Sequence, residues 1–283
     1  MIYLTMLTVI LELASAKPVV PHSSKEIVPV KPAIDSSDPL SVLEAQMPIV
    51  RTDWGRMDAG PYYVHNNVWN KAGVSRYFQA VGIKPLSDGG VSAGWAWRWP
   101  ETNRVMAFPE LVMGKNPWAA ASSHPNLPVQ LGEIDRFVVD LDLLHEGWGV
   151  RGTALQIWLT DDSVAEPQRI RHELMVWLRN DGVPVKGWMA DLEIGGAKYT
   201  LADDPDLGMD LKWKVFSLFR AEALEKGQLD LMPIFDYLVK KGLIDKKEWV
   251  ASVHLGTEIR GGSGLTRVKR FKLDLASRTT SQH

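Results

Sequence analysis

The amino-acid sequence predicts an all-β fold, either a sandwich or a barrel. Short runs rich in Val, Trp, Tyr and Phe follow one another from residue 62 onwards, and clusters of Gly, Pro, Asn and Asp separate them. A convincing helical pattern occurs once, at about residues 230–241, and Gly242 follows it as a stop signal. No repeat of fixed period is present, so a propeller or a solenoid is not supported. We therefore expect short strands with one helix packed on the outside of a sheet.

The expected strands are short segments bounded by turn residues. They are residues 62–69, 90–99, 104–112, 135–144, 153–160, 172–178, 186–194, 197–202, 211–219, 248–259 and 267–275. With 283 residues, of which 45% are hydrophobic, the chain can bury one sizeable core. One folded domain is the expectation.

Composition excludes several classes of function. The net charge of -2 and the dispersed Lys and Arg residues offer no basic stripe, so nucleic acid is not an expected partner. The chain has no cysteine, which excludes a disulfide, a thiolate metal site and a cysteine nucleophile. The seven His include no HExxH motif, so a zinc enzyme is disfavoured. We expect no metal, no cofactor and a monomer.

The N-terminal region differs from the rest of the chain. Residues 1–16 are apolar, too short to span a bilayer, and end in Ala14-Ser15-Ala16, as a signal peptide does, although Glu12 interrupts them and no basic residue precedes them. The protein is therefore expected to be secreted, extracellular or periplasmic, with no membrane contact after cleavage. Residues 17–48 are rich in Pro and are expected to form a poorly ordered linker. The folded domain is expected to span residues 49–277, and residues 278–283 are expected to form a C-terminal tail.

Side-chain parity places two acids on faces that are not core faces. Successive residues of a strand point to opposite faces of the sheet. Residues 172–178 have Leu174, Val176 and Leu178 on one face. The other face has Glu173, Met175 and Trp177. In residues 249–259, Glu258 likewise shares a face with Ser252 and His254, opposite the apolar residues.

Aromatic and polar residues follow the same parity elsewhere in the chain. Asn67 and Trp69 share a face, and so do Gln156 and Trp158. A third set consists of Trp95, Trp97 and Trp99. The flat apolar ring of Trp, with its single N–H donor, suits the C–H face of a sugar, so these faces predict a trough for a hydroxylated polymer. Two carboxyl groups in such a trough predict glycoside cleavage, because this reaction needs one acid and one nucleophile or base.

Several segments resemble glycoside hydrolase family 12, the compact endoglucanases and xyloglucanases with a β-jelly-roll fold. The resemblance spans about residues 52–275. Its most specific segments are Glu173-Leu174-Met175-Val176-Trp177-Leu178 and Gly256-Thr257-Glu258 with Gly261. It also rests on Asn66-Asn67-Val68-Trp69 and on the segment from Trp95 to Trp99 followed by Val105-Met106-Ala107-Phe108-Pro109.

The resemblance implies a fold, a reaction and roles for residues. The fold is a β-jelly-roll sandwich of two antiparallel sheets with a concave substrate cleft and one packed helix. The activity is that of a retaining endo-β-1,4-glucanase, which hydrolyses cellulose-type or mixed-linkage β-glucan by double displacement. Glu173 would be the nucleophile and Glu258 the general acid/base. The glycone side of the cleft would be lined by Asn67, Trp69, Met175 and Trp177, and Trp95 or Trp97 would extend it.

One position departs from the family pattern. Where the family commonly has an acidic residue near the nucleophile, this chain has Gln156. An amide can donate to Glu173 and help to keep it ionised, without the like-charge repulsion that raises a neighbouring pKa. The pH optimum is therefore expected to differ from that of acid-type relatives.

Alternative functions remain open at this point. A xyloglucan-specific endoglucanase differs only in whether loops leave room for xylose branches, and residues 112–132 are the main candidate for such a loop. A non-catalytic β-glucan-binding module would also have a tryptophan trough, but it would not need both acids. A purely structural sandwich leaves the aromatic faces unexplained.

Overall fold

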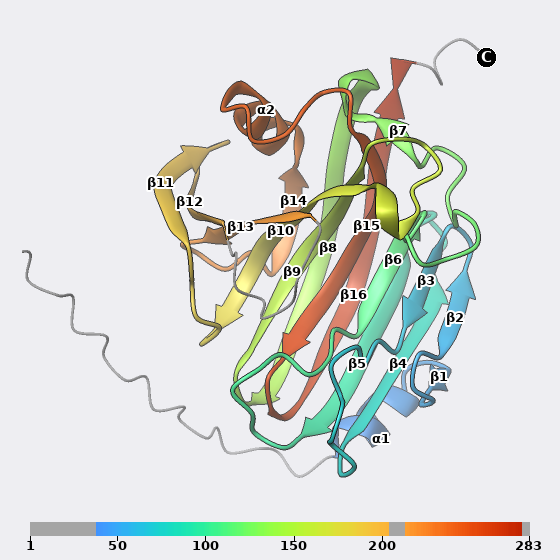
Figure 1. The fold of residues 1–283 in the computed structure, drawn as a ribbon. Helices are drawn as coiled ribbons and strands as arrows, with labels where there is room; N and C mark the ends of the chain where they lie inside the picture. The colour runs from blue at the N-terminus through green and yellow to red at the C-terminus, as the bar shows by residue number, and fades with distance from the viewer. Residues whose placement is uncertain (1–37, 204–212, 279–283) are drawn as a thin grey trace, which may run out of the picture.

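The computed structural model describes residues 38–203 and 213–278, which form two stacked β-sheets (Figure 1). The smaller sheet contains, in spatial order, β1 (Ile49–Val50), β4 (Phe78–Pro85), β5 (Val91–Trp99), β16 (Gly262–Ser277), β8 (Ile134–Trp148) and β14 (Lys226–Asp230). The larger sheet contains β11 (Trp188–Ile194), β12 (Ala197–Asp203), β13 (Lys214–Arg220), β10 (Ile170–Asp181), β9 (Arg151–Thr160), β15 (Trp249–Ile259), β6 (Glu110–Gly114), β3 (Tyr62–His65) and β2 (Arg56–Ala59). The short β7 (Val129–Gln130) pairs with β15, and two 3-10 turns span Leu131–Glu133 and Pro167–Arg169. This arrangement confirms the predicted β-jelly-roll sandwich.

One strand pair differs from the expected antiparallel sheets. Strands β10 and β13 run parallel, and Glu173 pairs with Val215 in their register. The hairpin of β11 and β12 lies between them in sequence and pairs antiparallel with β13. A parallel pair needs such a long connection, because the chain must return to the end at which the first strand began. The prediction of two purely antiparallel sheets is therefore wrong at this pair.

The core lies between the two sheets and is built by alternation along the strands. On β10 the side chains of Leu174, Val176 and Leu178 are fully buried and belong to the main apolar cluster. Strand β5 contributes Trp95, Trp97 and Trp99 to the same cluster. The strands of the larger sheet thus pack one face against the smaller sheet, and their other face points away from this core.

The prediction that Trp95 and Trp97 form part of a substrate trough is wrong. Both side chains are 0% exposed, because β5 belongs to the smaller sheet and points them between the sheets. The indole N–H of Trp95 donates to Oγ1 of Thr257 on β15, at 2.9 Å, and so joins the two sheets. The opposite face of β5 is also covered, since Ala96 packs with Leu43 of a helix. Parity showed that the rings share a face, but not that both faces of β5 are buried.

That helix is α1 (Pro39–Glu44), and it lies within the segment predicted to be a linker. Leu43 is 0% exposed and packs with Met47, Ala80, Ala96 and Leu265 against the outside of the smaller sheet. The linker prediction is therefore wrong for residues 38–48, which pack onto the domain. A six-residue helix is too short to show a helical period, so only Pro39 at its first turn marks it in the sequence.

The predicted helix at residues 230–241 is α2 (Met232–Lys240). It buries Ile234, Phe235 and Leu238, and the ring of Phe235 stacks on Phe137 of β8 at a centroid distance of 5.6 Å. Among the described residues, no helix is long and apolar enough to cross a membrane. The predicted signal peptide, the linker up to residue 37 and all but the first residue of the predicted tail lie outside the described residues.

We expect Leu43→Ala to destabilise the whole domain. The substitution leaves a cavity under α1, and such cavities cost about 2–5 kcal/mol of unfolding free energy. Urea unfolding followed by tryptophan fluorescence would measure the change, with Leu40→Ala as the matched control at a partly exposed position of the same helix. Equal stability of Leu43→Ala and the wild type would show that α1 is not part of the cooperative unit.

Candidate active site

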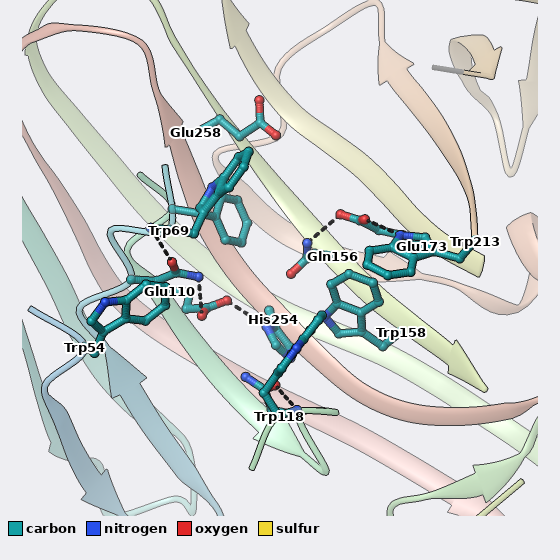
Figure 2. Close-up of a pocket in the computed structure, with 13 residues that line it drawn as sticks. Trp54, Trp69, Glu110, Trp118, Gln156, Trp158, Glu173, Trp213, His254 and Glu258 are labelled. Carbon is teal, nitrogen blue, oxygen red and sulfur yellow. Dashed lines mark hydrogen bonds and ion pairs between the residues drawn. The ribbon is translucent and has the colours of Figure 1, made fainter. Parts of the chain in front are cut away.

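A pocket of about 350 Å³ opens on the face of the larger sheet that points away from the smaller sheet. Its lining is rich in Trp, in amides and in acids (Figure 2). The lining residues are Trp54, Asn67, Trp69, Phe108, Glu110, Asn116, Trp118, Gln156, Trp158, Glu173, Trp213, His254 and Glu258. Large apolar surface combined with a few convergent polar groups is typical of a ligand site.

Glu173 lies in the pocket on β10 and is held by two neutral donors. The amide of Gln156 donates to Oε1 at 2.6 Å, and the indole N–H of Trp213 donates to Oε2 at 3.1 Å. Burial raises the pKa of Glu173 above its ordinary value, although both hydrogen bonds act in the opposite direction. The carboxyl group is therefore desolvated, oriented through both oxygens and open to the pocket.

Glu258 reaches the same pocket from β15, and its two preceding residues explain its position. A side chain at Gly256 would lie 2.5 Å from the ring of Phe108, so only glycine lets that ring cover the strand. Thr257 points inward, where it accepts the indole N–H of Trp95 and contacts Thr153 at 3.0 Å. Alternation then returns Glu258 to the pocket side, where it is partly exposed.

A third acid, Glu110 on β6, lies in the pocket floor and is almost fully buried. Its Oε2 accepts from Nδ1 of His254 at 2.7 Å, and its Oε1 accepts from Nδ1 of His65 and from the amide of Asn67, both at 3.1 Å. Burial acts to raise the pKa of Glu110, but the charge and hydrogen bonds of His254 and His65 outweigh it and lower this pKa to about 2. The side chain is therefore an ionised anchor.

Glu110 fixes the segment that follows β3. The side chain of Asn67 donates to Glu110 and accepts the backbone N–H of Trp69 at 3.0 Å. The indole of Trp54 lies beside His65, with ring centroids 5.6 Å apart. The buried carboxylate thus determines how Asn67 and Trp69 are presented to the pocket.

The comparisons with known proteins show the family of this chain. Residues 60–276 match the model of glycosyl hydrolase family 12. The chain belongs to glycoside hydrolase family 12. It is 28% identical to endoglucanase S of Pectobacterium parmentieri, over 86% of this chain and 94% of that protein. It is 22% identical to xyloglucan-specific endo-beta-1,4-glucanase A of Emericella nidulans, over 75% and 84% of the two chains. Its fold resembles that of the family 12 xyloglucanase from Bacillus licheniformis with a TM-score of 0.72, at 25% identity over 81% of this chain and 100% of that chain.

In this family 12 protein, five of the residues singled out from the sequence come together in one pocket. They are Asn67, Trp69, Gln156, Glu173 and Glu258. Figure 2 shows Gln156 directed toward Glu173, as the departure from the family pattern led us to expect. The two acids, which parity placed on non-core faces, do face a common cavity.

Met175 and Trp177 have the predicted parity but do not line the pocket, so their predicted direct role in the cleft is wrong for this structure. Both are nearly fully buried in a small apolar cluster on the pocket side of the sheet. The ring of Trp177 stacks on Phe219 at 4.9 Å and lies on Gly152, where any side chain would collide with it. Parity determined the face, but other side chains cover that face here.

The sequence predicted only part of the aromatic wall beside Glu173. The rings of Trp118, Trp158 and Trp213 meet edge to face, with centroids 5.2 to 6.3 Å apart. Trp118 comes from the 112–132 loop, which the sequence marked only as a loop near the cleft. Trp158 was placed with Gln156 on the predicted trough face, and it lines the pocket as expected.

Glu110 was missed as a member of the site. His254 was placed on the face of Glu258, but its contact with Glu110 was not predicted. Glu110 directly follows Pro109, and no sequence signal separates it from a solvent-exposed acid. Within the described residues, no group of three or more His, Cys, Asp or Glu side chains is arranged to hold a metal ion.

We expect Gln156→Leu to move the acid limb of the kcat/KM profile to higher pH. The family resemblance implies that Glu173 is the nucleophile, which must be ionised, and loss of its shortest hydrogen bond raises its pKa further. A hydrogen bond to a charged group contributes about 1.5–3 kcal/mol, which corresponds to a shift of roughly 1–2 pH units. The pH profile of kcat/KM would measure it, with Gln156→Asn as the control that keeps an amide. An unmoved acid limb in a folded Leu variant would refute the role of Gln156.

We expect Glu110→Gln to lower the folding stability at neutral pH. We also expect the variant to lose less stability than the wild type when the pH falls. The folded pKa of about 2 lies below the ordinary value of 4.5, so ionised Glu110 stabilises the fold above that value. This stabilisation is lost as the pH falls from about 4.5 toward 2. Breaking the buried pair should cost about 3–5 kcal/mol at pH 7.

Urea unfolding of Glu110→Gln at several pH values from 7 to 3 would test this. Asp58→Asn is the matched control, because Asp58 is an exposed carboxylate paired with Arg56 and should contribute less than about 1 kcal/mol. If Glu110→Gln and the wild type lose stability equally steeply between pH 5 and 3, the buried pair is not the acid-sensitive element.

Proposed function

We propose that this family 12 glycoside hydrolase is a retaining endo-β-1,4-glucanase that cleaves internal bonds of cellulose-type or mixed-linkage β-glucan. The observation that carries the proposal is the pairing of two acids with different environments in one pocket. Glu173 is buried between two neutral donors, whereas Glu258 is partly exposed on a neighbouring part of the same cavity. Endoglucanase S of Pectobacterium parmentieri, by its name, supports the same activity.

The proposed reaction is a double displacement. An oxygen of Glu173 attacks the anomeric carbon while Glu258 donates its proton to the departing glycosidic oxygen. A glycosyl ester on Glu173 results, and the deprotonated Glu258 then takes a proton from water, which attacks the same carbon. The donors Gln156 and Trp213 hold the carboxylate of Glu173 in place before attack and stabilise it again when it departs.

The pocket walls fit a β-glucan chain. Tryptophan side chains present flat apolar surface on several sides, and Asn67, Asn116 and Gln156 place amides among them. Such a combination binds the C–H faces and the hydroxyl groups of pyranose rings. The N-terminal segment and the polymeric substrate together support the proposal that the enzyme is secreted and acts outside the cell.

A second candidate function is xyloglucan hydrolysis. Trp118 lines the pocket from a loop and not from a strand. Its side chain is more than half exposed. A loop can leave room for xylose branches where a strand cannot. The likeness to the xyloglucanases of Bacillus licheniformis and Emericella nidulans supports this alternative.

We expect the wild type to release reducing ends from β-glucan and Glu173→Gln to release none. An amide cannot form the glycosyl ester, and the variant should fold normally because the core side of β10 is unchanged. Assays on carboxymethylcellulose, barley β-glucan and tamarind xyloglucan would show the activity and the preferred polymer together. Polymer retention without new ends in the wild type would instead identify a binding module.

Proton NMR of early hydrolysis tests the retaining mechanism separately. A cello-oligosaccharide should first give the β-anomer, since two inversions retain the configuration. Initial formation of the α-anomer would refute Glu173 as the nucleophile. The controls are Glu173→Gln and Glu258→Gln, which should give no product of either configuration.

A further inference from the structure

Trp188 on β11 lies outside the pocket and has no role in the reaction described above. Its side chain is 64% exposed, the largest exposed fraction among the exposed large hydrophobic side chains of the described residues. Trp54 and Trp118, the other exposed tryptophans in that part of the chain, both line the pocket. The exposed indole of Trp188 presents a flat apolar surface that the reaction described above does not use.

Strand register places Trp188 on the catalytic face of the sheet. Residues directly opposite each other on paired strands share a face. Trp188 pairs with Ala202, Ala202 with Ser217, Ser217 with Met175, and Met175 with Gln156. This row ends at the residue that holds the nucleophile. Figure 1 shows β11 at one edge of the larger sheet, four strands away from β9, which corresponds to roughly 20 Å along the sheet.

A second row of paired residues reaches Asp191 on the same face, because a register shift between Trp188 and Ala190 changes the alternation by one residue. Trp177 pairs with Phe219, Phe219 with Thr200, and Thr200 with Asp191. The side chains agree with the register, because Trp177 stacks on Phe219 and the hydroxyl of Thr200 donates to Oδ1 of Asp191 at 2.8 Å. The buried rings of Trp177 and Phe219 and the polar residues Thr200 and Asp191 at the sheet edge therefore lie on the same face of the larger sheet.

Polar groups orient the ring of Trp188 and flank it. Its indole N–H donates to Oδ1 of Asp191 at 3.3 Å, so one carboxylate oxygen joins Trp188 and Thr200. Asp191 also lines a shallow hollow of about 490 Å³ together with Glu193, Lys198 and Thr200. A flat ring with hydrogen-bonding groups at its edge is suited to the face and the hydroxyl groups of a pyranose.

We propose that Trp188, oriented by Asp191, is a distal binding site for the β-glucan chain, used by polymers that extend beyond the pocket. The proposal rests on the proposed function, since the occupant is a further segment of the same substrate. Continuity of the face from Gln156 to Trp188 favours this occupant over an unrelated partner. A short oligosaccharide held in the pocket does not reach β11, whereas a long chain does.

The test compares Trp188→Ala with the wild type on long and short substrates. The apparent KM on the preferred polymer, barley β-glucan or tamarind xyloglucan, should rise roughly tenfold, the effect of one stacked ring. The kcat on the polymer and both constants on cellotetraose should stay unchanged. Trp188→Phe should keep most of the affinity, and Asp191→Ala should lose part of it. Val164→Ala, at an equally exposed position elsewhere, is the matched control.

Affinity electrophoresis in gels containing the same polymers provides a readout that does not need activity. The wild type should be retarded, and Trp188→Ala should be retarded less. An unchanged polymer KM together with unchanged retardation would overturn the proposal, and so would an equal loss on cellotetraose. Light scattering supplies a further check, because a wild-type dimer that Trp188→Ala converts to a monomer would assign the ring to an interface between copies. Absence of any hydrolysis by the wild type would refute the proposed function, while the gel would still test Trp188.

Discussion

The carboxylate of Glu110 lies almost fully buried in the floor of the pocket, and it is held there by two imidazoles and an amide. An unpaired charge at this depth would cost several kcal/mol. Its partners come from β15, from β3 and from the segment after β3, so one ionised group holds three parts of the larger sheet in fixed positions. The pocket depends on this arrangement, because the same contacts orient Asn67 and, through it, Trp69.

A polar floor is possible because each strand of the larger sheet has two different faces. Toward the smaller sheet the side chains are apolar, and the hydrogen bond from Trp95 to Thr257 joins the two layers inside the core. On the other face the same strands carry Glu173, Gln156 and His254. A strand whose core face is packed in this way is a rigid support, and precise positioning of catalytic groups requires one. The core-facing residues of these strands therefore support the acids from the side opposite the pocket.

Alternation along the strands made it possible to predict from the sequence which face many of the site residues occupy. It could not predict which of those faces other side chains cover. Glu173 and Glu258 could be assigned to non-core faces because their neighbours alternate cleanly with Leu, Val and Ile. The same rule gave the wrong result for Trp95 and Trp97, because both faces of β5 are buried. Helix α1 covers the face that carries Ala96, and the tryptophans point between the two sheets. The rule failed in part for Trp177, whose face was right but whose ring is covered by Phe219. The role of Glu110 could not be predicted from the sequence, because its burial and its two histidine partners depend on strands that are distant in the sequence.

The environment of Glu173 presents an electrostatic conflict that its neighbours resolve. In the proposed mechanism the group must be anionic to attack, yet burial raises its pKa and favours the neutral form. Arginine or lysine beside it would favour ionisation more strongly, but a cation would also stabilise the carboxylate against forming an ester, since the ester carries no charge. Gln156 and Trp213 donate hydrogen bonds without a net charge, so they orient both oxygens while leaving the carboxylate less stabilised than an ion pair would. Neutral donors around a desolvated carboxylate are thus consistent with a nucleophile that must be ionised before attack and uncharged after it.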